Sequence, residues 1–207
     1  MPTKKLPEQT GNSCAAHCTV IGIAELLDVD YLLSKGFAEM TLWPTIKFKA
    51  GESPLTDALA KADNSDPRRI VTESELRWGG SVKASILCDD VEKTTALGFV
   101  GPMAPALAAL FNMIKGGNLV TTIALQDGIY YNCSYLMLKG AAAKSAVYEG
   151  MHNILVTNFK GSTFYYNPNE KVPVWTKDPA DWKTLENQNG GTYSYVFTGV
   201  CVELKRK

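Results

Sequence analysis

Residues 12–27 have the sequence NSCAAHCTVIGIAELL, in which almost every position from Cys14 onward is apolar or small. A helix that is apolar on all its faces must be buried on all of them. Asn12 and Ser13 are residue types that commonly precede the first turn of a helix. The pattern therefore predicts a central, buried helix that begins at Asn12 or Ser13, ends near Leu27 and carries Cys14 in its first turn.

The last third of the chain has the alternation and the turn residues of an antiparallel sheet. Met151–Phe159 and Ser162–Tyr166 are predicted to form a hairpin, because Lys160-Gly161 between them suits a tight turn. Two more strands are predicted at Ile129–Leu138 and Thr192–Leu204, which are rich in β-branched and aromatic residues.

Between these two parts the pattern changes several times, and no internal repeat is present. Helices are predicted at Tyr31–Met40, Ser53–Lys61, Ser74–Trp78, Asp89–Leu97, Ala104–Lys115 and Pro179–Leu185, with a polar loop at Ala62–Arg69 and a strand at Asn118–Leu125. We therefore predict one domain of the α+β class. A mainly helical lobe (1–117), headed by the cysteine-bearing helix, packs on a mainly antiparallel β lobe (118–207).

The composition fits one globular domain and argues against several partners. The chain has 207 residues, of which 45% are hydrophobic and 20% are charged. Lysine plus arginine and aspartate plus glutamate number 21 each, so no basic surface for nucleic acid is expected. The N-terminal segment lacks the pattern of a signal peptide, and no stretch is apolar enough to cross a bilayer. We expect no membrane insertion, and either a cytoplasmic protein or one exported without a cleaved N-terminal signal.

The cysteines are five in number and scattered, which argues against a disulfide framework. They are Cys14, Cys18, Cys88, Cys133 and Cys201. Cys14 stands out because the start of a helix supplies partial positive charge and free N–H groups, which favour a thiolate. The chain has only two histidines, so any histidine chemistry uses His17 or His152. His17 would lie beside Cys14 on the same helix rather than over it, and we therefore expect His152 to be the base.

Two more polar residues complete a candidate site. Asn167 follows His152 by 15 positions across the predicted hairpin, which brings the end of the second strand beside the start of the first. Its amide oxygen can then hold the imidazole in one tautomer and orientation. Gln9 precedes Cys14 by five residues, and its side-chain N–H can point at a developing oxyanion together with the Cys14 backbone N–H.

This ordered set resembles the papain-like cysteine peptidases, with the nearest likeness to those that process bacteriocin leaders. The resemblance lies in QTGNSCAA (9–16), in a later histidine at a strand start, and in the Asn-Pro that closes the next strand. LFNMIKGGNLV (110–120) also looks like that family's helix–glycine–strand step. Two positions differ: those relatives often have Gly or Trp where this chain has Ala15, and Asp where it has Asn167.

The resemblance implies a cysteine hydrolase without a cofactor that cleaves a peptide or amide bond in a protein or peptide substrate. Cys14 would be the nucleophile, His152 the base, Asn167 its orienting residue, and Gln9 part of the oxyanion hole. Acyl transfer to an amine and deamidation of glutamine use the same groups. A bacterial effector or toxin and a housekeeping peptidase both fit these residues.

The same residues also allow two interpretations in which the protein is not a catalyst. Cys14, His17 and Cys18 lie at i, i+3 and i+4 on one helix face, and with His152 they form a candidate zinc site. A papain-like fold that serves only as an interaction module is the second. Bound zinc with an unreactive Cys14 would favour the first, and slow labelling of Cys14 would favour the second.

Overall fold

A computed structural model of the chain describes residues 1–51, 60, 63–87, 123–139, 147–177 and 182–207. The central helix α1 spans Cys14–Leu27, and all but two of its residues are buried, as its sequence predicts. Ser13 occupies the N-cap position, but its hydroxyl does not cap the helix. The Ser13 carbonyl instead accepts hydrogen bonds from the backbone N–H groups of Ala16 and His17.

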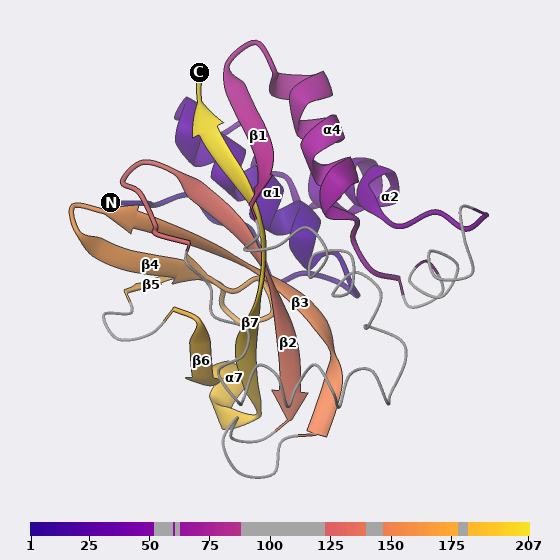
Figure 1. The fold of residues 1–207 in the computed structure, drawn as a ribbon, viewed down its shortest axis with the longest axis vertical. Coiled ribbons are helices and arrows are strands. Elements are labelled where there is room, and N and C mark those ends of the chain that lie inside the picture. The colour runs from indigo at the N-terminus through magenta and orange to yellow at the C-terminus, as the bar shows by residue number, and fades with distance from the viewer. Residues whose placement is uncertain (52–59, 61–62, 88–122, 140–146, 178–181) are drawn as a thin grey trace.

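Seven antiparallel strands form one sheet, which confirms the α+β class (Figure 1). The strands are β1 (Val82–Leu87), β2 (Tyr130–Lys139), β3 (Val147–Phe159), β4 (Ser162–Tyr166), β5 (Trp175–Lys177), β6 (Thr184–Asn187) and β7 (Tyr193–Arg206). Their order is β1-β7-β2-β3-β4-β5, and β6 pairs separately with β7. The C-terminal strand is therefore central, because it pairs with β1, β2 and β6.

The turn and the second strand of the hairpin have the predicted boundaries, but β3 begins at Val147, four residues before the predicted start at Met151. β3 and β4 pair from Leu155↔Tyr166 to Phe159↔Ser162. The turn residues Lys160 and Gly161 have φ values of 51° and 71°. Two positive φ angles match the right-handed twist of the flanking strands, which explains why this short sequence turns so tightly.

Helix α1 packs on one face of the sheet. Its apolar side chains form a core with Leu155, Tyr166, Val202 and Leu204. Gly22 allows the close approach, because a Cβ there would lie 3.0 Å from the Leu204 Cδ1 atom. The opposite face has its own apolar cluster, formed mainly by Tyr131, Cys133, Tyr135, Ile154, Val156, Tyr195, Phe197 and Cys201.

The other described helices are η1 (Phe37–Leu42), α2 (Trp43–Ile46), α4 (Pro67–Trp78) and α7 (Gln188–Gly191). Helix α4 starts seven residues before the helix predicted at Ser74–Trp78, so the predicted loop ends too late. The Asp66 carboxylate accepts a hydrogen bond from the Arg68 N–H, and Pro67 occupies the first turn. This aspartate–proline start outweighs the polar character of the sequence around it.

Three further predictions differ from the structure. The helix predicted at Tyr31–Met40 starts too early, because residues 31–34 are not helical and η1 covers Phe37–Leu42. The helix predicted at Pro179–Leu185 is wrong at its end, where residues 184–187 form β6 against β7. Residues 123–125 are not in a strand. No strand is predicted at β1, although Val82, Ala84 and Ile86 alternate with Lys83 and Ser85, and its backbone pairs with β7 along its whole length. The helices predicted at 89–97 and 104–115, and all but one residue of that at 53–61, lie outside the described residues.

Within the described part of the chain, no helix is long and apolar enough to cross a membrane.

Candidate active site

Cys14 lies at the first position of α1, directly against strand β3. Its side chain is buried. The backbone N–H of Asn153, the residue after His152, donates a hydrogen bond to the Cys14 sulfur at 3.3 Å. The start of α1 is therefore in contact with the middle of β3, across 139 residues of sequence, and the prediction that His152 lies at a strand start is wrong.

The spacing of Cys14 and Cys18 has a structural explanation at the same strand. The last pair that β3 forms with β4 is Leu155↔Tyr166, so Asn153 lies beyond the end of β4. Its N–H donates to Cys14 and its carbonyl accepts from the Cys18 thiol, at a sulfur–oxygen distance of 3.4 Å. The two thiols, one helical turn apart, thus provide hydrogen-bond partners for backbone groups that would otherwise be buried without partners.

His152 and Asn167 are joined directly. Nε2 of His152 lies 2.8 Å from Oδ1 of Asn167, and both residues are buried. The His152 ring also packs on Tyr195, with ring centroids 4.9 Å apart and planes inclined by 33°. The hairpin therefore brings the two residues together as expected from its register. Among the hydrogen bonds of the described residues, none joins Cys14 to His152.

The contacts of the Asn167 amide determine which histidine nitrogen carries the proton. Oδ1 accepts from the backbone N–H of Asn169 at 3.1 Å, and Nδ2 lies 3.4 Å from the Glu170 carboxylate, which can only accept. The amide oxygen therefore faces His152, whose Nε2 must be the donor. In the neutral imidazole this leaves Nδ1 as the proton acceptor.

Burial controls the charge of both residues. Burial raises the pKa of the Cys14 thiol to about 11, although hydrogen bonds from the Asn153, Ala15 and Cys14 N–H groups act in the opposite direction. Burial lowers the pKa of His152 to about 4, and its hydrogen bond to Asn167 opposes this only in part. The ligand-free site thus holds a neutral thiol and a neutral imidazole near pH 7, and the thiolate favoured by the helix start is outweighed by desolvation.

The backbone of Gln9 contacts the segment that follows β4, beside Asn167. Its backbone N–H donates to the Pro168 carbonyl at 3.1 Å, directly beside Asn167. Its side-chain Nε2 donates to the Gly11 carbonyl at 2.8 Å, while its Oε1 is buried without a partner in the described structure. Gln9 therefore lies in the same neighbourhood as the hairpin, with its amide turned toward its own loop.

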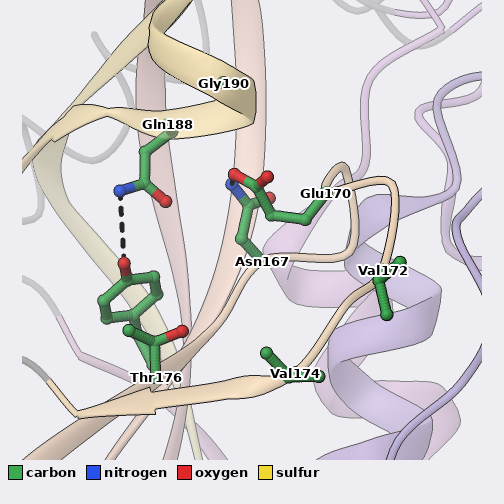
Figure 2. Close-up of a pocket in the computed structure, with 8 residues that line it drawn as sticks. Asn167, Glu170, Val172, Val174, Thr176, Gln188 and Gly190 are labelled. Atoms are coloured by element: carbon green, nitrogen blue, oxygen red, sulfur yellow. Dashed lines mark hydrogen bonds between the residues drawn. The ribbon is translucent and has the colours of Figure 1, made fainter.

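A pocket of about 260 Å³ adjoins Asn167 (Figure 2). It is lined by Tyr165, Asn167, Glu170, Val172, Val174, Thr176, Gln188 and Gly190. Figure 2 shows the side chains of Asn167 and Glu170 close together, across from Gln188. Nε2 of Gln188 donates to the Tyr165 hydroxyl at 3.2 Å. Because Asn167 lines this pocket and also contacts His152, the pocket adjoins the candidate site.

A buried network of amide side chains lies near Cys14, and no sequence motif predicts it. Nδ2 of Asn153 donates to Oδ1 of Asn132 at 2.9 Å, and Nδ2 of Asn132 donates to the Ala15 carbonyl and the Thr19 hydroxyl, each at 3.0 Å. This chain of hydrogen bonds joins the first turn of α1 to β2 and β3. Asn132 and Asn153 lie within apolar strands, and this is the signal that could have marked them, since a buried amide needs partners.

The alternative zinc site does not assemble. His17 turns its Nε2 toward Glu39, whereas Cys14 and Cys18 face Asn153. In the described part of the chain, no group of three or more histidine, cysteine, aspartate or glutamate side chains is arranged to hold a metal ion.

Comparisons with known proteins add no further assignment: no model of a protein family matches the chain, and a search of curated proteins finds no significant match.

Proposed function

We propose that this chain is a papain-like cysteine hydrolase that cleaves a peptide or amide bond. The observation that supports the proposal most is the contact between Cys14 and Asn153, which brings a helix-start cysteine to the residue next to His152, whose imidazole contacts Asn167. A cysteine, a base and a third group that orients the base form the usual arrangement for nucleophilic catalysis by a thiol.

The proposed reaction begins from a neutral pair. His152 Nδ1 accepts the thiol proton as the Cys14 sulfur bonds to the substrate carbonyl carbon, and the carbonyl π electrons move onto its oxygen. The Cys14 backbone N–H and the side chain of Gln9 stabilise that oxyanion. Gln9 must first release the Gly11 carbonyl, which its Nε2 now contacts. His152 then protonates the leaving amine, and a thioester on Cys14 remains.

The second half of the reaction returns the enzyme to its initial state. His152 removes a proton from water, the hydroxide bonds to the thioester carbon, and the Cys14 sulfur leaves and regains its proton. Asn167 accepts a hydrogen bond from Nε2 throughout, which stabilises the imidazolium in both halves. An amine that reaches the thioester in place of water would give acyl transfer, and a glutamine side-chain amide as substrate would give deamidation.

The test is covalent labelling with a peptide that carries a thiol-directed electrophile. Wild-type protein should be labelled stoichiometrically at Cys14, as mapped by mass spectrometry of proteolytic fragments. His152→Ala should slow this labelling by about 100-fold, in the range that general bases contribute.

Cys201→Ala is a matched control, because Cys201 is also buried and lies on β7 in the opposite apolar cluster. Its labelling should equal that of wild type. Labelling of Cys14 at the rate of free cysteine, unchanged in His152→Ala, would contradict the proposal and favour an interaction module.

A further inference from the structure

Glu39 lies in η1, and one of its carboxylate oxygens lies close to four polar groups around the start of α1. Oε1 of Glu39 is 2.6 Å from the backbone nitrogen of Thr10 and 3.4 Å from the Ser13 hydroxyl, which shares its one proton with the Thr10 carbonyl at 3.0 Å. The same oxygen is 3.3 Å from Nε2 of His17 and 3.7 Å from Nζ of Lys35. A carboxylate only accepts hydrogen bonds, so a single group can hold these donors together.

The segment held in this way is the one that joins Gln9 to Cys14. Thr10, Gly11 and Asn12 are exposed, and Gly11 has a φ of 60°, which favours glycine. One end of the segment is fixed where the Gln9 N–H meets Pro168, and the other where α1 begins. Between these ends, Glu39 supplies the contacts to the backbone at Thr10 and to the hydroxyl of Ser13.

We infer that Glu39 is a positioning residue for the oxyanion hole, an inference that rests on the proposed function. It touches no reacting atom. It holds Thr10 and Ser13, so that the backbone N–H of Cys14 and the side chain of Gln9, once it has released the Gly11 carbonyl, can both reach the oxygen of the attacked carbonyl. A π-helical turn such as η1 is rare and often occurs at functional sites, which agrees with this role.

A peptide aldehyde measures the oxyanion hole directly. Its carbonyl carbon bonds to the Cys14 sulfur, the π electrons move onto oxygen, and the thiol proton passes to His152. The oxygen of the resulting tetrahedral adduct then occupies the oxyanion site. Iodoacetamide alkylates the same sulfur by displacing iodide, and no oxyanion forms. Comparing the affinity for the aldehyde with the rate of alkylation by iodoacetamide therefore distinguishes a change in the oxyanion hole from a change in the reactivity of the thiol.

Glu39→Ala should weaken aldehyde binding about tenfold or more, while the rate of alkylation by iodoacetamide stays within about twofold. Glu39→Gln keeps a side-chain oxygen that accepts hydrogen bonds and should restore most of the affinity. Ser13→Ala removes only one donor, and a loss of about two- to fivefold is expected. This milder variant carries the test if Glu39→Ala does not fold.

Glu25→Ala is the matched control. The Glu25 carboxylate also accepts backbone N–H groups of the N-terminal segment, those of Thr3 and Lys4, but at the other end of α1. Its aldehyde affinity should equal that of wild type. An equal loss in Glu25→Ala, or no loss in Ser13→Ala and Glu39→Ala, would overturn the role of Glu39. Absence of aldehyde adducts in wild type would instead count against the proposed function itself.

Discussion

The backbone N–H of Asn153 lies 3.3 Å from the sulfur of Cys14, so the helix start meets the strand at the residue next to His152. This contact joins the two halves of the candidate site, which are otherwise held by separate elements. The amide network of Asn132 and Asn153 lies directly beneath it. The position of Cys14 relative to the histidine thus depends on polar groups buried in the core as well as on apolar packing.

The amide network should make a measurable contribution to stability. Asn132→Leu would leave Nδ2 of Asn153 and the Ala15 carbonyl without these partners, at a cost of about 1–3 kcal/mol in the free energy of unfolding. Urea denaturation monitored by tryptophan fluorescence measures this change. Asn158→Leu, at a half-buried position on the neighbouring strand β3, is the control and should cost less. An equal loss in both variants would remove the special role of the network.

Replacing Asn167 should separate orientation from charge. Asn167→Ala removes the acceptor for Nε2 of His152 and should lower the rate of Cys14 labelling by a peptide electrophile about tenfold or more. Asn167→Asp keeps an acceptor and adds a negative charge, which raises the pKa of His152. Its labelling should persist, with the acidic limb of the pH profile moved to higher pH. Equal rates in wild type and Asn167→Ala would contradict the orienting role.

The alkylation of Cys14 in the ligand-free protein should depend on pH in a characteristic way. Because burial raises the pKa of this thiol to about 11, the thiolate fraction falls about tenfold for each pH unit below that value. The iodoacetamide rate should therefore rise steadily from pH 7 to 10. A preformed thiolate–imidazolium pair would give a rate that is nearly constant from pH 5 to 8, and that result would show that the resting pair is charged.

His152 should also contribute to acid sensitivity. Its pKa is about 4 in the folded protein and near 6.5 when unfolded, so the unfolded state binds the proton first as the pH falls. The contribution of His152 to stability is full above pH 6.5 and is lost as the pH falls toward 4, by ~3 kcal/mol in total. Urea unfolding at pH 7 and pH 4 measures the effect. His152→Gln should lose less stability than wild type over this range, and an equal loss would refute the assignment.

The fold follows from the sequence where local and long-range signals agree. Helix α1 is apolar on all faces and is buried, and the turn at Lys160-Gly161 sets the boundaries of β3 and β4. β1 and β6 are harder to predict, because their partner β7 is distant in sequence. Pairing with β7 decides their conformation, and local propensity does not show it.

The contact between His152 and Asn167 could be predicted from the sequence, but the rest of the geometry around the candidate site could not. The hairpin register accounts for the contact between His152 and Asn167, because β4 ends at Tyr166 opposite Leu155, so that Asn167 follows β4 close to the part of β3 that carries His152. The neutral state of Cys14 could not be predicted, because it depends on how deeply the helix start is buried. The contacts of Glu39 could not be predicted either, because no sequence motif includes this residue and only the fold brings it near Thr10 and Ser13.

The most direct test is to trap the acyl-enzyme. The protein is mixed rapidly with an activated peptide ester, quenched in acid and examined by intact-mass and fragment mass spectrometry. A thioester is expected on Cys14 in wild type and not in Cys14→Ala, and it should form about 100-fold more slowly in His152→Ala. An acyl group on another residue, or formation at Cys14 at the same rate in wild type and His152→Ala, would contradict the proposed mechanism.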